Sequence, residues 1–191
     1  MADTPGVNQV KGSAVIGTLR FLKERFGDER LRETLASLDT ADRQALEGAL
    51  VSAWYPLPLL LRLMRQAEAG FGKDVPHLYR AIGAASADYG LNTVYKIFFK
   101  IGSPQFIISR ASRVFGSYYQ RGDMVVTETG PGFVKLELRD FADGAPEYCE
   151  RIFGWMTHTM ELCGAKGLQP NHVTCVHRGD DVCRFEGTWK T

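Results

Sequence analysis

The C-terminal stretch at residues 171–187 reads NHVTCVHRGDDVCRFEG and decides how the second half of the chain folds. Cys175 and Cys183 each stand four residues from Gly179, the centre of a polar turn. Residues that face each other in an antiparallel pair have Cα atoms about 4.5–5.5 Å apart. We therefore expect two facing thiols on a β-hairpin, a spacing that suits a shared metal ion and also permits a disulfide.

His172 is a candidate third ligand, three residues before Cys175. Positions 172 and 175 of a regular strand point to opposite faces, so His172 joins the thiols only if the strand is irregular. Cys149 and Cys163 lie 14 residues apart in one predicted helix, about 21 Å along its axis, so at most one of them takes part. From the residues alone, three interpretations stay open: a metal site, a disulfide or redox pair, and unligated thiols.

The residues before this stretch predict a sheet with a covering helix. Alternating side chains on both sides of the Gly130–Gly132 turn indicate a first hairpin. Residues 147–164 have helical periodicity, and 172–189 form the second hairpin. We expect an antiparallel sheet of about four strands, covered on one face by the 147–164 helix.

Residues 9–120 are predicted to be helical. One helix from Ser13 ends at Gly27, a second follows from Asp28, and a third opens at Asp39 or Thr40. Pro56 and Pro58 break the pattern before a helix over 59–70, another begins near Pro76, and 102–104 interrupts the aromatic segment that follows. Helices followed by hairpin, helix and hairpin predict an α+β fold. We expect a flexible tail at 1–8 and one domain over 9–191, divided into a helical part (9–120) and a hairpin-helix-hairpin part (121–191).

Composition excludes several classes of function. The 191 residues carry a net charge of +1 with no basic patch, which argues against nucleic acid as a partner. The longest apolar run, at 54–61, contains two prolines and is too short to span a membrane. Without a secretory signal pattern, we expect a cytoplasmic protein with reduced thiols. No nucleophile-elbow, phosphate-loop or zinc-protease motif is present, so we expect no enzyme activity.

The ending Cys175-x7-Cys183, within RGDDVCRFE, resembles the end of the 4-vinyl reductase domain. Its superfamily also includes the haem-nitric-oxide-binding fold and the transport-particle (TRAPP) subunits. Residues 10–189 are also similar to a paralogous family of unknown function, found mainly in myxobacteria. The stretches that carry this similarity are KGSAVIGTLRFLKERFG, SAWYPLPLLLRLM, DYGLNTVYKIFFKIGSPQFIISRASRVF and GDDVCRFE.

The resemblance implies a set of zinc ligands. In aromatic-effector-sensing transcription activators, this domain holds zinc with a helical Cys and a Glu-x2-Cys-x7-Cys sequence whose middle Cys follows the helical one by 26 residues. Here Cys149 precedes Cys175 by 26 residues, and His172 stands at the Glu position. The implied ligands are Cys149, His172, Cys175 and Cys183, without Cys163. Four protein ligands leave no open position for water, so the implied zinc is structural.

Haem is a cofactor of one branch of this superfamily. His77 is the histidine most similar in setting to a proximal haem ligand, because it lies in the predicted helical stretch VPHLYRAIG. No Tyr-x-Ser-x-Arg motif of the kind that holds haem propionates is present. The sequence therefore argues against haem.

Aromatic residues are abundant before the first hairpin and have two interpretations. They form ordinary core and a dimer interface, or some of them line an apolar ligand pocket. Related domains accommodate phenols, acyl chains or tetrapyrroles, which favours a pocket. Its candidate residues are Trp54, Tyr55, Tyr95, Phe98, Phe99, Phe106 and Trp155.

The leading hypothesis is a non-enzymatic sensory domain that binds an apolar or aromatic small molecule or an acyl chain. We expect a homodimer formed through the N-terminal helices, and a signalling protein that reads the bound state. Two other hypotheses stay open: a protein-interaction adaptor of the transport-particle type without a ligand, and an enzyme or chaperone of tetrapyrrole metabolism.

Overall fold

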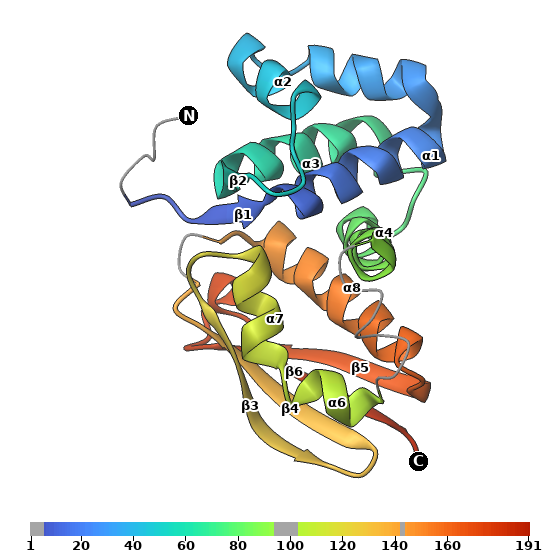
Figure 1. Cartoon of the computed structure of the whole chain (residues 1–191), viewed down its shortest axis with the longest axis vertical. Coiled ribbons are helices and arrows are strands. Elements are labelled where there is room, and N and C mark those ends of the chain that lie inside the picture. The colour runs from blue at the N-terminus through green and yellow to red at the C-terminus, as the bar shows by residue number, and fades with distance from the viewer. Residues whose placement is uncertain (1–5, 94–102, 142–143) are drawn as a thin grey trace.

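Helices fill the first half of the chain and an antiparallel sheet the second, which confirms the predicted α+β class. The computed structural model describes residues 6–93, 103–141 and 144–191 (Figure 1). The first half contains β1 (Gln9–Lys11), α1 (Gly12–Ala36), α2 (Thr40–Glu47), β2 (Trp54–Pro56), α3 (Leu57–Phe71), α4 (Leu78–Thr93), α6 (Pro104–Ile108) and α7 (Ala111–Tyr118). The second contains β3 (Asp123–Gly130), β4 (Phe133–Arg139), α8 (Pro146–Leu162), β5 (Lys166–Thr174), the 3-10 helix η1 (Val176–Arg178) and β6 (Cys183–Lys190).

The N-terminal helices begin close to the predicted positions, but the third, expected to run into the segment broken by Pro56, ends at Glu47. Gly27 has φ 88° and ψ 165°, so α1 is two helical segments joined by a kink at the predicted stop. The Asp39 side chain accepts a hydrogen bond from the Asp42 backbone N–H and caps α2 as expected. Pro58, predicted to break a helix, instead lies in the first turn of α3, where its missing N–H has no intrahelical acceptor to lose.

The first strands form a small sheet that the sequence did not predict. β1 and β2 pair antiparallel, with Val10 opposite Tyr55. In the segment predicted as a tail, Asn8 is buried, and its side-chain oxygen accepts hydrogen bonds from the Gln9 and Arg121 backbone N–H groups. These bonds join the start of the domain to the segment before β3.

The main sheet has the order β3-β4-β6-β5, with every neighbouring pair antiparallel. Pro170 lies in β5, and an edge strand tolerates proline because one side of its backbone has no partner. Figure 1 shows α8 between the sheet and α4, with α1 and α3 beyond α4. α8 is therefore in contact with both halves of the fold. Among the described residues, no helix is long and apolar enough to cross a membrane.

α4 and α8 pack closely because each carries a glycine at the contact. A Cβ atom on Gly83 would lie 2.0 Å from the Arg151 carbonyl oxygen. A Cβ atom on Gly154 would lie 2.2 Å from the Arg80 carbonyl oxygen. Neither distance is physically tolerable, so the two glycines fix where α8 lies, and α8 in turn positions the residues of both candidate sites.

Candidate functional site

Four sulfur and nitrogen ligands converge where α8 meets the end of the sheet. Cys149 comes from the first turn of α8, His172 from β5, Cys175 from the residue after β5, and Cys183 from the start of β6. One ligand atom from each residue lies within 4.8 Å of all the others. The structure thus brings together all four residues implied by the resemblance.

A β-bulge resolves the geometric objection to His172. His172 pairs with Phe185 and Thr174 pairs with Arg184, so the register shifts at Val173. The extra residue in the bulge reverses the alternation, so His172 and Cys175 can point to the same face. His172 can therefore lie on the same side of the hairpin as Cys175 and Cys183.

The three sulfur atoms are spaced as ligands of one ion. Cys149 Sγ lies 3.6 Å from Cys175 Sγ and 3.8 Å from Cys183 Sγ, and the last two are 3.9 Å apart. Tetrahedral zinc with a metal–sulfur distance near 2.3 Å would separate its sulfur ligands by about 3.8 Å. A disulfide requires about 2.0 Å, and all four cysteines are free thiols.

Hydrogen bonds inside the cluster distribute its charge unevenly. The hydrogen bond with Cys149, the nearby His172 ring and the hydrogen bond from the Val176 backbone N–H lower the pKa of the Cys183 thiol to about 4, against the opposing effect of burial. The bond to Cys183, burial and the neighbouring thiols raise the pKa of Cys149. The cluster is thus arranged around one thiolate, and a cation would stabilise further deprotonation.

The residues around the cluster hold the His172 ring in place. The ring stacks on Phe185, with centroids 4.4 Å apart. Its Nδ1 lies 3.6 Å from Glu150 Oε1, longer than a hydrogen bond, and Glu150 also accepts a hydrogen bond from Arg80. A carboxylate beside the second nitrogen of a histidine is the usual outer partner of a metal ligand.

His158 and the fourth cysteine have other neighbours. His158 contacts Asp88 and Glu161 at 3.0 and 3.3 Å. Cys163 belongs to a separate apolar cluster with Met160 and Trp189, and burial raises the pKa of its thiol to about 11.

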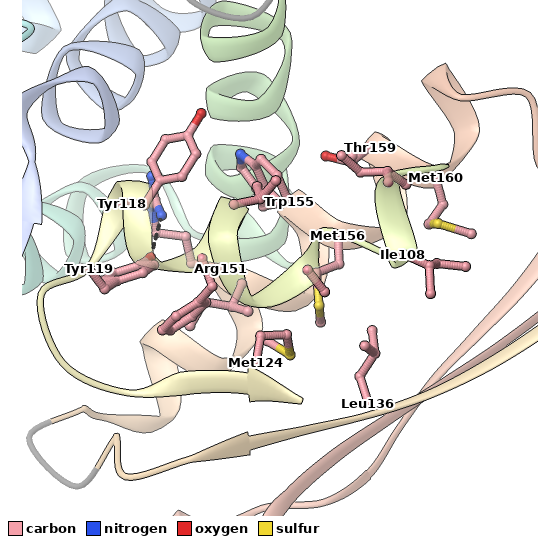
Figure 2. A pocket seen from close by; sticks show the side chains of 15 residues that line it. Ile108, Tyr118, Tyr119, Met124, Leu136, Arg151, Trp155, Met156, Thr159 and Met160 are labelled. Atoms are coloured by element: carbon pink, nitrogen blue, oxygen red, sulfur yellow. Dashed lines mark hydrogen bonds between the residues drawn. The ribbon is translucent and has the colours of Figure 1, made fainter. Parts of the chain in front are cut away.

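An apolar cavity of about 70 Å³ lies along α8, between α6, α7 and the sheet (Figure 2). Three methionine side chains contribute to its walls, together with aliphatic and aromatic groups. Its lining residues are Ile107, Ile108, Ala111, Val114, Phe115, Tyr118, Tyr119, Met124, Leu136, Arg151, Ile152, Trp155, Met156, Thr159 and Met160.

Arg151 is the only charged residue that lines this cavity among the described residues, and it is 2% exposed. Its Nη1 donates a hydrogen bond of 2.9 Å to the Tyr119 hydroxyl, as Figure 2 shows. Its Nε and Nη2 have no hydrogen-bond partner in the described part of the chain, and the same holds for Trp155 Nε1 and Thr159 Oγ1. The exposed surface of the cavity is therefore apolar, and these polar atoms are buried behind it.

Of the pocket residues predicted from sequence, Trp155 lines the cavity. Trp54 and Tyr55 lie in β2, where Lys11 Nζ is 4.4 Å from the Trp54 ring centroid. Phe106 lies on α6 with the Arg110 guanidinium 3.7 Å from its ring centroid, and it does not line the cavity. The other three, Tyr95, Phe98 and Phe99, fall outside the described residues.

Sequence reasoning missed Arg151, Tyr119 and the methionines. One signal for Arg151 was available: Arg151, Trp155 and Thr159 recur at every fourth position, which places them on one face of α8. A charged residue on the face that carries a tryptophan is a candidate for burial.

No protein-family model and no curated protein matches the sequence. Solved structures do match by fold. An H-NOX protein from S. oneidensis in the Fe(II) ligation state is 14% identical, with a TM-score of 0.76 over 95% of this chain and 96% of that one. An oxygen-binding H-NOX domain related to soluble guanylate cyclases is 12% identical, with a TM-score of 0.65 over 95% of both chains.

A third structure, from work on haem redox potential and porphyrin distortion, is 12% identical and has a TM-score of 0.71 over 95% of both chains. At these identities the likeness shows the fold alone. The fold agrees with the haem-nitric-oxide-binding part of the resemblance, and no family model or curated protein supports 4-vinyl reductase or the myxobacterial family.

These neighbours overturn the sequence argument against haem. That argument rested on an isolated His77 and a missing motif, whereas the fold over 95% of the chain is one in which related structures hold haem. Met thioethers serve with histidine as axial haem ligands elsewhere. The cavity has Met124, Met156 and Met160, and none of the four histidines lines it.

Proposed function

We propose that the chain is a sensory domain that binds a small apolar molecule in the cavity beside α8 and a structural zinc ion at the neighbouring cysteine–histidine cluster. The observation that carries the proposal is the cavity itself, whose walls are formed by aliphatic, aromatic and thioether groups. Small-molecule sites in proteins are lined predominantly by hydrophobic and aromatic side chains.

Zinc is supported by the donor set and its spacing. Three thiols and one imidazole form a common structural zinc set, and the sulfur–sulfur distances of 3.6–3.9 Å agree with a tetrahedron. All four ligands come from the protein, so the ion would hold the end of β5 and the start of β6 to α8. Zinc in this position stabilises the helix that also lines the cavity.

Haem is one ligand that the fold makes eligible, since related structures carry it. When bound it would supply an iron for small diatomic ligands, and Met124, Met156 or Met160 would be the residues available to hold it. Other apolar molecules would use the same walls. Signalling would then follow if ligand binding favours one packing of α8 against α4, since a ligand shifts an equilibrium only through unequal affinity for two states.

The metal is tested by elemental analysis of the purified chain. We expect one zinc per chain, lost in Cys175→Ser and in Cys183→Ser. Cys163→Ser is the matched control and should retain the metal, because Cys163 lies outside the cluster. A fully folded wild-type protein that takes up no zinc would contradict the metal assignment.

The cavity is tested by calorimetric titration of the zinc-loaded chain with octan-1-ol and with haemin. We expect one binding site per chain for at least one of them. Ala111→Phe should abolish binding, because Ala111 lines the cavity and a phenyl group would fill it. The control is Ala41→Phe on exposed α2 surface, and it should bind as the wild type does.

A further inference from the structure

A surface groove of about 710 Å³ lies next to the cavity, where α6 and α7 meet the edge strand β3. Ile108, Ala111 and Met124 line both spaces. Ile108 and Met124 are 4% and 3% exposed, and Figure 2 shows both among the side chains that line the cavity. The wall that separates the cavity from the groove is therefore one side chain thick.

The cavity alone is small for an organic ligand. Its volume of about 70 Å³ is comparable to that of two water molecules in the liquid. Pockets that enclose drug-sized molecules measure about 300–1,000 Å³. The groove lies in that range, whereas the cavity has room for only one end of such a molecule.

Met124 is the adaptable part of the wall between the two spaces. A methionine side chain has three rotatable bonds and fits irregular gaps, so a change of its rotamer could join the cavity to the groove. Ala111 presents only a methyl group at the same wall. A chain of methylene groups is narrow along its whole length and has the shape to pass such an opening.

The end of the molecule inside the cavity must be apolar. The surface that the cavity presents is apolar, and the polar atoms of Arg151, Trp155 and Thr159 are buried behind it. A polar group placed there would lose its hydrogen bonds to water without new partners in the cavity surface. The polar end of an amphiphile would therefore lie outside the cavity.

The groove has the polar groups that the cavity surface does not have. Hydroxyl and amide groups in its lining come from Gln105, Ser109, Ser112 and Thr129. Among the described residues, Asp123 is the only charged residue that lines the groove. The Ser112 hydroxyl donates a hydrogen bond to Asp123 Oδ1, and Oδ2 has no hydrogen bond in the described part of the chain.

Asp123 favours one kind of end group in the ligand. An ionised carboxylate accepts hydrogen bonds and cannot donate them. A hydroxyl or ammonium group could donate to Oδ2, whereas an anionic group would be repelled. Because Asp123 is exposed, both effects are modest, and they select among end groups more than they hold the chain.

We infer that the ligand is a straight-chain aliphatic molecule that lies across the cavity and the groove. Its apolar end would occupy the cavity, and an end that donates hydrogen bonds would lie beside Asp123. This inference rests on the proposed ligand-binding function and specifies the shape and polarity of the ligand. Long-chain alcohols and long-chain amines share this chemistry, and the experiment separates them.

The first test measures how affinity depends on chain length. Zinc-loaded full-length protein is titrated calorimetrically with butan-1-ol, hexan-1-ol, octan-1-ol and decan-1-ol. Xenon, which binds in apolar cavities, reports on the cavity alone and is followed by xenon NMR. We expect xenon to bind, and the affinity of the alcohols to rise about fourfold for each buried methylene group as far as decan-1-ol.

A groove variant separates the two spaces. Ser112→Trp adds an indole group to the groove and none to the cavity, because Ser112 lines only the groove. It should lower the affinity for decan-1-ol at least tenfold and leave xenon bound. Ser109→Trp, also exposed and in the groove lining, repeats the test if Ser112→Trp does not fold. Arg113→Trp is the matched control on exposed α7 surface that lines neither space, and it should bind both as the wild type does.

The second test identifies the end group. Near neutral pH, decan-1-ol or decylamine should bind at least threefold more tightly than decanoate, and the tighter of the two shows which donor the groove prefers. Asp123→Asn should remove most of the difference from decanoate. Asp74→Asn, at an exposed carboxylate that lines neither space, is the control and should keep it.

Any one of three results would overturn the inference. Xenon binding without a gain in affinity beyond butan-1-ol would leave the proposed apolar cavity intact and remove the groove from the site. Unchanged binding of decan-1-ol in the groove variants would place the chain elsewhere. Binding of decanoate as tightly as the other two decyl compounds would remove the role of Asp123. Absence of binding by xenon and by every alcohol would contradict the proposed function together with the inference.

Discussion

The Cys149 and Cys175 sulfur atoms lie 3.6 Å apart, although 26 residues separate the two cysteines along the chain. Cys149 lies in the first turn of α8, which covers the sheet, and Cys175 follows the edge strand β5. Their contact joins the two layers at one end of α8. The same helix carries Arg151 two residues later, so the metal cluster and the ligand cavity share one structural element.

Replacing Glu150 with alanine should weaken metal binding without abolishing it. Glu150 lies beside His172 Nδ1 and accepts a hydrogen bond from Arg80. It therefore orients the metal ligand His172 without binding the metal itself. Loss of such an outer partner typically lowers metal affinity about 10- to 100-fold. Competition with a chromophoric chelator measures the change. Glu161→Ala, on the same helix but beside His158, should leave the affinity unchanged.

Gly83→Ala should destabilise the domain strongly, because the new methyl group would lie 2.0 Å from the Arg151 carbonyl oxygen. Forcing extra atoms into a packed contact costs about 1–3 kcal/mol and sometimes more. Urea denaturation measures the free energy of unfolding. In Gly70→Ala the methyl group would meet no atom within 4 Å, so this helical control should gain up to about 1 kcal/mol. An unchanged free energy of unfolding in Gly83→Ala would contradict the close approach of α4 and α8.

Arg151→Met should raise the melting temperature of the ligand-free protein. A buried charge with no ion-pair partner among the described residues opposes folding, and an apolar side chain of similar length can occupy its place. A gain of 1 kcal/mol would appear as a rise of about 2–4 °C in a domain of this size. Differential scanning calorimetry gives the value. A lower melting temperature would show that Arg151 already has a stabilising partner in the free protein.

Glu137 should make stability depend on acid pH. Hydrogen bonds from Arg184 and Arg139 lower the pKa of its carboxyl group in the folded state. Its contribution is therefore complete above the ordinary carboxyl pKa and is lost as the pH falls through the lowered folded pKa. The difference in melting temperature between wild type and Glu137→Gln should be largest near neutral pH and shrink in acid. A constant difference would contradict this origin.

Much of the fold was predictable because local signals agreed with the tertiary structure. Gly27 marks the kink in α1, Asp39 caps α2, and the Gly130–Gly132 turn joins β3 to β4. β1 and β2 were missed because each has three residues, too few for alternation to be visible. Pro58 was misjudged as a break because sequence alone does not place it in the first turn of a helix.

The candidate sites were predictable to different degrees. Ligand spacing implied all four cluster residues, but the bulge at Val173 that admits His172 depends on pairing with β6. Arg151 was missed because arginine on a helix is usually solvated, and its burial arises only when α8 packs on both α4 and the sheet. For haem the error was the opposite one, because the absence of one local motif was given more weight than the overall fold.

The mass of the purified full-length chain under native conditions tests the central claim most directly. The account predicts a species heavier than the polypeptide by one zinc ion and, after incubation with the apolar compound that binds in the titration, by one ligand molecule. In Cys175→Ser the zinc increment should disappear, and in Ala111→Phe the ligand increment. A folded protein that shows only the mass of the polypeptide under both conditions would contradict the account.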